Sequence, residues 1–274
     1  MSLKLIFVFF YFYNILNSEQ CYGIRILKNR QIWSTSGLPF LMHDYLNSDD
    51  KKIITLSPGG FRGFYIFGLC RFIKENYNLE EYVFSGASAG AWNSLFLTFK
   101  GDSDKFVETI FEIDFKNISD LNLIEKEITN SILKSYDTDD FELNKLYVGT
   151  TVFKRFRFKP VVYTDFEDLQ DALDCCIASS HIPFITGSFF YKYRGLYSFD
   201  GGFSKYPYLN GNYSDIHITP SIWNKDMTNR LFPSLDIRDY TNLLSKDKFN
   251  LKELYLQGYN DAKENKEKLD HLFK

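Results

Sequence analysis

The chain has 274 residues, 45% of them hydrophobic and 24% charged, a composition that excludes an intrinsically disordered protein. Its formal net charge of −3 provides no basic surface for a phosphate backbone, so we expect no DNA or RNA partner. The four cysteines are too few and too irregularly spaced for a disulfide scaffold, and no pair has the spacing of a zinc site. We expect buried or free thiols and no metal.

An apolar stretch at residues 5–16 follows Lys4 near the start of the chain. A run of about a dozen residues suits a signal peptide and is shorter than the roughly 20 residues of a membrane-spanning helix. We therefore expect residues 1–23 to be a signal peptide or an N-terminal hydrophobic segment, and residues 24–274 to form one domain. The expected location is the secretory pathway or a membrane, or the cytoplasm if this segment has no targeting function. The alternative is an N-terminal core element.

From residue 53 onward, short apolar runs alternate with helical patterns. The patterns predict strands at 53–56, 82–84, 146–152, 156–163, 196–199 and 216–218, and helices at 64–76, 91–99, 105–115, 121–133, 168–178 and 251–273. Alternation with short connections favours a mainly parallel sheet covered by helices and joined by right-handed crossovers. The expected fold class is therefore α/β.

A first motif, Gly86-Ala87-Ser88-Ala89-Gly90, has the form G-x-S-x-G between a predicted strand and a predicted helix. A serine on such a sharp turn needs small neighbours, because a Cβ at Gly86 or Gly90 would crowd the adjoining strand and helix. The N-terminus of the next helix points at the same place and favours negative charge there. This pattern indicates that Ser88 is a nucleophile, although a plain turn of small residues has the same composition.

A second glycine-rich motif, residues 58–63, also follows a strand and opens a helix, and its sequence is Pro-Gly-Gly-Phe-Arg-Gly. Its backbone N–H groups are candidates for an oxyanion hole. A P-loop is excluded because no Gly-Lys-Ser/Thr follows, and the glycine spacing does not fit a dinucleotide site. We expect the Arg62 side chain to anchor the loop through polar contacts. The candidate residues of this loop are Gly59, Gly60, Phe61, Arg62 and Gly63.

A third motif, Asp200-Gly201-Gly202, follows the predicted strand at 196–199. An acid followed by two glycines suggests a carboxylate held at a strand end beside a permissive backbone, although this tripeptide is also a common turn.

Together the three motifs resemble the patatin-like phospholipase family. Residues 53–99 are similar to its oxyanion loop and nucleophile elbow, and residues 199–202 to its aspartate motif. Residues 178–184 are similar to its small-residue helix end with an Ile-Pro turn, and residues 257–262 to a Gly-Tyr-containing helix. The resemblance implies a patatin-like three-layer α/β/α fold with a mainly parallel central sheet.

The resemblance also implies a lipid acyl hydrolase in which Asp200 takes the Ser88 proton and an acyl-enzyme forms. Implied partners are a phospholipid or acylglycerol substrate and a membrane or lipid-droplet surface, with no metal or organic cofactor. One departure is Pro58, which stands where the family has the first of three glycines and has no N–H to donate.

Two alternatives remain. One is an α/β-hydrolase with a triad of Ser88, Asp200 and either His217 or His271, and this order along the chain is allowed. The other is a non-catalytic lipid-binding protein with the same fold, which Pro58 favours and which intact Ser88 and Asp200 disfavour.

Overall fold

The computed structural model describes residues 51–118, 121–154, 157–204, 206–209, 214–223 and 250–273, together with the backbone of 31–33 and 39–41. The predicted signal peptide or hydrophobic segment at residues 1–23 lies outside the described residues. None of the helices in the described ranges combines the length and the apolar character needed to cross a membrane.

The strands form one mixed sheet with the order β2-β1-β6-β5-β4-β3-β9, and β8 joins it by pairing with β5 and β7. The strands are β1 (Gln31–Trp33), β2 (Pro39–Leu41), β3 (Lys52–Leu56), β4 (Tyr82–Ala87), β5 (Leu146–Lys154), β6 (Arg157–Tyr163), β7 (Tyr191–Tyr193), β8 (Leu196–Phe199) and β9 (Ile216–Ile218). The central strands β9, β3, β4 and β5 are parallel, which confirms the predicted α/β class. Strands β5 and β6, which follow each other along the chain, form an antiparallel pair.

Alternate residues of the strands enter two different cores. Ile54, Phe84 and Val148 belong to the larger cluster, whereas Ile53 and Val83 belong to a smaller cluster on the other face of the sheet. Side chains alternate across a strand, so both faces of β3 and β4 are buried. This accounts for adjacent apolar residues such as Ile53-Ile54 and Val83-Phe84 in these strands.

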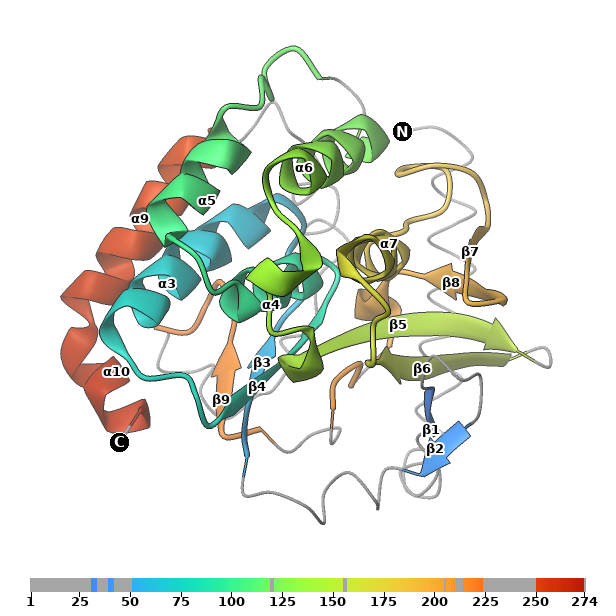
Figure 1. Cartoon of the computed structure of the whole chain (residues 1–274), viewed down its shortest axis with the longest axis horizontal. Helices are drawn as coiled ribbons and strands as arrows, with labels where there is room; N and C mark the ends of the chain where they lie inside the picture. The colour runs from blue at the N-terminus through green and yellow to red at the C-terminus, as the bar shows by residue number, and fades with distance from the viewer. Residues whose placement is uncertain are drawn as a thin grey trace.

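Helices cover the larger core. They are α3 (Gly63–Asn76), α4 (Ala89–Thr98), α5 (Ser103–Phe111), α6 (Leu121–Ser135), α7 (Leu169–Ser179), α9 (Leu251–Glu264) and α10 (Lys266–Leu272). Figure 1 shows α4 and α7 above one face of the sheet with α6 beyond them, and α3 beside α9 at the outer side. The connections of β3 to α3 and of β4 to α4 therefore bring two strand-to-helix turns to the same edge of the sheet.

The crossing of α3 and α9 depends on a glycine from each helix. A Cβ on Gly68 would lie 1.9 Å from the Tyr255 carbonyl oxygen, and a Cβ on Gly258 would lie 1.9 Å from the Tyr65 carbonyl oxygen. The two backbones thus approach more closely than any side chain allows. This contact places α9 against the helix that follows the glycine-rich loop.

The prediction of one terminal helix over 251–273 is wrong, because the helix breaks at Asn265 into α9 and α10. The Asn265 side chain donates to the Asp261 carbonyl oxygen at 2.9 Å. Local side-chain bonding of this kind competes with the backbone pattern that would continue the helix.

Candidate active site

Ser88 occupies a sharp turn between the end of β4 and the start of α4. Its φ of 53° and ψ of −128° are rare for a residue with a side chain. A Cβ on Gly86 would lie 2.1 Å from the Gly90 carbonyl oxygen, and one on Gly90 would lie 2.1 Å from the Leu56 carbonyl oxygen. Both glycines are therefore required by the space around the turn, and the turn presents Ser88 at the carboxyl edge of the sheet.

Asp200 follows directly after β8, and its carboxylate is buried against Ser88. Ser88 Oγ donates to Asp200 Oδ2 at 2.6 Å, and the Gly202 N–H donates to Asp200 Oδ1 at 2.6 Å. A Cβ on Gly201 would lie 2.4 Å from the Gly149 carbonyl oxygen, so this turn fits only a glycine beside β5. Both oxygens of the carboxylate are thus held in place, one of them by the candidate nucleophile.

Strand β5 explains why two residues so far apart in sequence meet. β6 covers one edge of β5, so β4 and β8 must share the other edge. β4 runs parallel to β5 and ends with Ala87 opposite Gly149, whereas β8 runs antiparallel and ends with Phe199 opposite Thr151. The two strands therefore approach each other end to end, and the residues after them face one another.

The environment of Asp200 changes its protonation. Burial raises the pKa of Asp200 to about 7, and the hydrogen bonds from Ser88 and Gly202 oppose that rise. A carboxyl group with a pKa near neutrality is able to accept a proton and return it at the pH of a cell.

The segment after α7 ties both candidate residues together. The Ser88 N–H donates to Ser179 Oγ at 2.8 Å, and Ser179 Oγ donates to the Gly149 carbonyl oxygen at 2.6 Å. The Asp200 N–H donates to the His181 carbonyl oxygen at 2.7 Å. Residues 178–184 resemble a motif of the family in sequence, but no role of Ser179 was predicted from that resemblance. The available signal was the buried run of small residues at a helix end.

The glycine-rich loop lies beside Ser88. Gly60 has a φ of 51°, and the loop forms a single 3-10 turn, η2 (Gly60–Arg62), before α3. The Arg62 N–H already donates to the Gly59 carbonyl oxygen at 3.0 Å, and the Gly63 N–H donates to the Gly60 carbonyl oxygen. The backbone amides before Arg62 are therefore the better candidates for an oxyanion hole.

Two side chains of this loop differ in their surroundings. The Arg62 side chain is exposed and makes no hydrogen bond or ion pair with the rest of the described chain, so it does not anchor the loop as expected. Pro58 lines the cavity next to Ser88 and lies beside the aspartate motif, since a Cβ on Gly202 would be 3.2 Å from the Pro58 ring. Gly63 lies close to α4, where its Cβ would be 2.6 Å from that of Ala89.

A cavity of about 170 Å³ opens at Ser88 and Asp200 and includes Gly59, Gly60 and Phe61. Its wall is mostly apolar and comes from α3, α4, α5 and α6, with Phe64, Phe67, Phe96, Ile110, Ile124 and Ile132 among its residues. Besides Asp200, the lining includes one further carboxyl group, that of the buried Glu125. The candidate nucleophile and its carboxylate partner therefore line a mainly apolar cavity.

The histidines of the alternative triad are not placed between Ser88 and Asp200. His217 lies on β9 with Nδ1 2.8 Å from Thr55 Oγ1, and burial lowers its pKa to about 4. His271 lies in the last turn of α10. Since Ser88 and Asp200 bond directly, no imidazole bridges them in this arrangement.

Within the described ranges, no group of three or more His, Cys, Asp or Glu side chains is arranged around a possible metal position.

Comparison with known proteins agrees with this geometry. The sequence model of the patatin-like phospholipase family matches residues 54–209, more than half of the chain, and this span contains Ser88 and Asp200. The chain therefore belongs to the patatin-like phospholipase family, and its fold is the α/β fold expected for that family. No curated protein gave a significant sequence match.

Proposed function

We propose that this protein is a lipid acyl hydrolase in which Ser88 is the nucleophile and Asp200 is the base. The observation that carries the proposal is the 2.6 Å hydrogen bond from Ser88 Oγ to Asp200 Oδ2. Both residues line an apolar cavity, and Ser88 lies on a backbone turn that keeps its hydroxyl at the sheet edge. Direct contact with a carboxylate activates a serine without an imidazole between them.

In the first half of the proposed reaction, Asp200 takes the Ser88 proton while Oγ attacks the ester carbonyl carbon. The tetrahedral intermediate then collapses, the C–O bond to the alcohol breaks, and the alcohol leaves with the proton held by Asp200. In the second half, Asp200 removes a proton from water, which attacks the acyl-enzyme, and Ser88 recovers its proton as the fatty acid departs. Asp200 is therefore ionised at the start and at the end of each half of the reaction.

The oxyanion of each tetrahedral intermediate needs hydrogen-bond donors. We assign this role to the amides at Gly59, Gly60 and Phe61, which line the same cavity as Ser88. The Arg62 amide is the weakest of the four candidates because it is engaged by Gly59. Pro58 contributes no N–H, so a hole formed by the later amides does not depend on it.

The proposed substrates are glycerolipids, either phospholipids or acylglycerols, presented at a membrane or lipid-droplet surface. Support comes from the apolar residues of α3, α4, α5 and α6 that line the cavity, because such a lining suits an acyl chain. We also propose, from the apolar stretch at residues 5–16, that residues 1–23 direct the protein to the secretory pathway or to a membrane.

Fatty-acid release from phospholipid and diacylglycerol substrates tests this function. We expect hydrolysis by the wild type, loss with Ser88→Ala, and loss of most turnover with Asp200→Asn, because a neutral amide accepts no proton. His217→Ala is the matched control and should keep its activity. Activity that survives Asp200→Asn contradicts the dyad, and activity that requires His217 supports a triad. Lipid binding without hydrolysis by well-folded wild type would support a non-catalytic protein.

A further inference from the structure

Four exposed aromatic side chains form a continuous patch on the segment that precedes Asp200. Phe184, Phe189, Phe190 and Tyr197 are 53%, 39%, 46% and 46% exposed, and they are four of the seven large hydrophobic residues exposed in the described part of the chain. Ring centroids of successive members are 5.2, 4.4 and 4.7 Å apart. An apolar cluster of this kind marks a surface that contacts something other than water. We call these residues the aromatic patch.

The aromatic patch is continuous with the wall of the candidate active site. Ile182 and Thr186 line the cavity, and Phe184 lies on the turn between them. Thr186 closes this turn at both ends, because its N–H donates to the Ile182 carbonyl oxygen at 3.0 Å and its Oγ1 accepts the Ile182 N–H at 2.8 Å. Two residues of this turn, Ile182 and Thr186, therefore line the cavity, while Phe184 of the same turn is exposed to solvent.

The backbone at Phe184 is held in an unfavourable conformation. Its φ of 64° lies in the left-handed region, which is rare for an aromatic residue. Strain of this kind persists only where the surrounding structure imposes it, and it occurs often at functional positions. Here it keeps a large ring on the surface rather than in the core.

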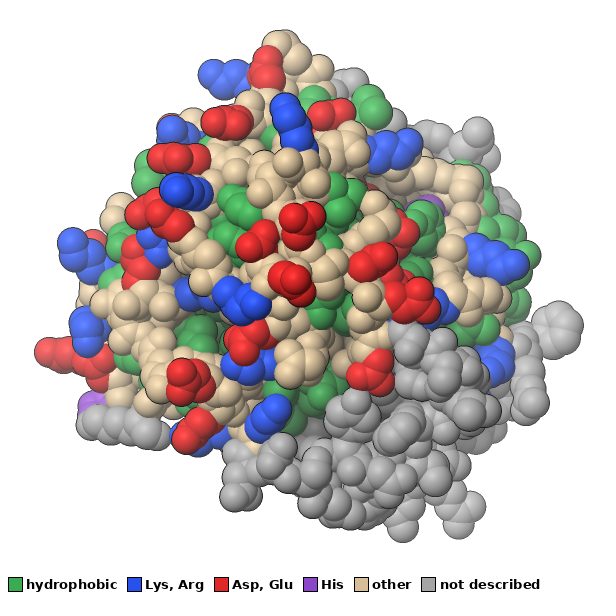
Figure 2. Space-filling view, in the orientation of Figure 1, with side chains coloured by type: hydrophobic (Ala, Val, Ile, Leu, Met, Phe, Trp, Pro, Cys, Tyr) green, Lys and Arg blue, Asp and Glu red, His purple; other side chains and the backbone are tan. Residues whose placement is uncertain are grey.

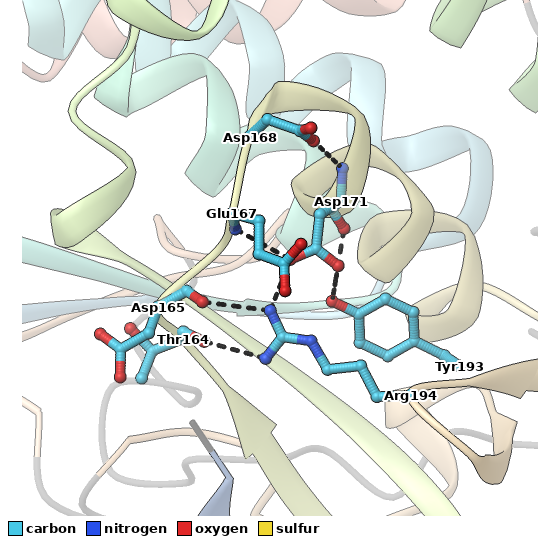
Figure 3. Close-up of polar contacts among 7 residues, drawn as sticks. All are labelled: Thr164, Asp165, Glu167, Asp168, Asp171, Tyr193 and Arg194. Carbon is cyan, nitrogen blue, oxygen red and sulfur yellow. Dashed lines mark hydrogen bonds and ion pairs between the residues drawn. The ribbon is translucent and has the colours of Figure 1, made fainter. Parts of the chain in front are cut away.

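The hairpin of β7 and β8, which carries Tyr197, is fixed to the body of the protein by Arg194. Figure 3 shows its guanidinium between the carbonyl oxygens of Thr164 and Asp165, at 3.2 and 3.1 Å, and the carboxylate of Asp171. Tyr193 donates from its hydroxyl to the same carboxylate at 2.8 Å. These contacts attach the hairpin, and with it Tyr197, to α7 and to the segment after β6.

The segment that carries the aromatic patch has only positive charges, those of Lys192 and Arg194. Residues 182–199 and the strands β5 and β6 contain no Asp or Glu, although the whole chain has a net charge of −3. Lys192 is exposed here and is the cross-strand partner of Tyr197. Figure 2 shows hydrophobic and basic side chains over β7 at the right-hand edge, whereas acidic side chains gather over α7 and the middle of the face.

We propose that the aromatic patch, with Lys192, docks the protein on the surface of a bilayer containing anionic phospholipids, with the cavity facing the lipid. This inference rests on the proposed function. Exposed rings enter the interfacial region, while nearby lysines are attracted to anionic headgroups. A substrate molecule leaving the bilayer would then meet the turn at Ile182 and Thr186 before it reaches Ser88.

Vesicle flotation tests the proposal, with Ser88→Ala protein as the background so that hydrolysis does not alter the lipid. The vesicles contain phosphatidylcholine with or without phosphatidylglycerol. We expect binding to the anionic vesicles that weakens with salt. Replacing Phe184, Phe189 and Phe190 together by alanine should weaken it by about tenfold or more. Lys192→Glu should weaken it by about fivefold on anionic vesicles only.

Two further variants separate docking from folding. Phe184→Gly fits a positive φ, so it should preserve the fold and still weaken binding. Leu256→Ala on α9 removes a side chain that is 47% exposed elsewhere, and it should bind as the background does. Equal binding by the triple variant and by the Ser88→Ala background overturns the proposal. The aromatic patch would then be a candidate contact surface for a protein partner. Equal losses in the triple variant and Leu256→Ala also overturn it.

Fluorophosphonate labelling of the same variants with Ser88 intact separates the two proposals. The soluble probe needs no vesicle, so labelling reports the proposed activity and flotation reports docking. If the protein is labelled but its flotation does not depend on the aromatic patch, the docking proposal is overturned and the proposed function is not. Unlabelled protein whose flotation depends on the patch supports docking and contradicts the proposed function.

Discussion

Ser179 accepts a hydrogen bond from the backbone N–H of Ser88, with 2.8 Å between Oγ and N. Ser179 is fully buried at the end of α7, and its own proton goes to the Gly149 carbonyl oxygen. One hydroxyl therefore links the candidate nucleophile to the strand along which β4 and β8 meet. The position of Ser88 depends on this link as well as on the glycines of its own turn.

Ser179→Ala should lower both stability and activity. It leaves the buried N–H of Ser88 and the Gly149 carbonyl without this partner, which costs roughly 1–3 kcal/mol in the free energy of unfolding. A displaced turn should also slow lipid hydrolysis by about tenfold or more. Urea denaturation and fatty-acid release measure the two effects.

Ser94→Ala is the matched control for that variant. Ser94 is equally buried under the same turn, but its hydroxyl has no hydrogen-bond partner in the described structure. Its replacement should leave stability unchanged or raise it. Equal effects of Ser94→Ala and Ser179→Ala would contradict a specific role for the Ser179 hydroxyl.

The backbone at Ser88 gives a prediction that does not depend on catalysis. Ser88→Gly and Ser88→Ala both remove the hydroxyl, but only glycine adopts a φ of 53° without strain. Ser88→Gly should therefore be more stable than Ser88→Ala by about 1 kcal/mol. Denaturation midpoints measure the difference, and a less stable glycine variant would argue against strain at this turn.

Asp200 predicts a dependence of stability on pH. Burial raises its pKa from 3.8 to about 7, so between these values the folded state keeps a proton that the unfolded state releases. Stability from this group is complete below about pH 4 and is lost as the pH rises through 7. The loss is roughly 4 kcal/mol from the size of the shift.

Asp200→Asn removes this ionisation, so the variant should gain stability relative to wild type as the pH is raised from 4 to 8. The difference between the two unfolding curves is the quantity to follow, because the buried His217 titrates in both proteins. A difference that stays constant across this range would mean that Asp200 ionises normally. Wild-type hydrolysis should rise with pH and reach half of its maximum near pH 7.

Pro58→Gly tests whether the departure from the family pattern limits the enzyme. If the amides after Pro58 form the oxyanion hole, hydrolysis should change by less than about threefold. Stability should fall by about 1 kcal/mol, since glycine makes the unfolded chain more flexible. A large gain in the rate of hydrolysis would instead show that the missing N–H at Pro58 limits the natural protein.

The sequence was informative where local physical constraints dominate. Both glycine-rich motifs were predicted to connect a strand to a helix. In the structure, the motif at 58–63 connects β3 to α3 and the motif at 86–90 connects β4 to α4. Apolar runs also located the central strands, because β3 and β4 are buried on both faces. The family resemblance, rather than periodicity, supplied the pairing of Ser88 with Asp200.

Long-range arrangements were not predictable in the same way. No local pattern shows that β5 pairs with β4 along one half and with β8 along the other, and that arrangement places Asp200 opposite Ser88. The hairpin of β7 and β8 was missed because Tyr191–Tyr193 is too short for a periodic signal. The cavity likewise combines residues of four helices that amphipathic patterns indicated only as core-facing.

Labelling by a fluorophosphonate, with the adduct mapped by mass spectrometry, shows directly whether Asp200 activates Ser88 as a nucleophile. A Ser88–Asp200 dyad predicts an adduct on Ser88 in the wild type, no labelling of Ser88→Ala, and labelling of Asp200→Asn that is slower by about a hundredfold or more. Ser180 lines the same cavity and should stay unmodified in all three proteins. The absence of an adduct in folded wild-type protein, or equally fast labelling of wild type and Asp200→Asn, would exclude the dyad.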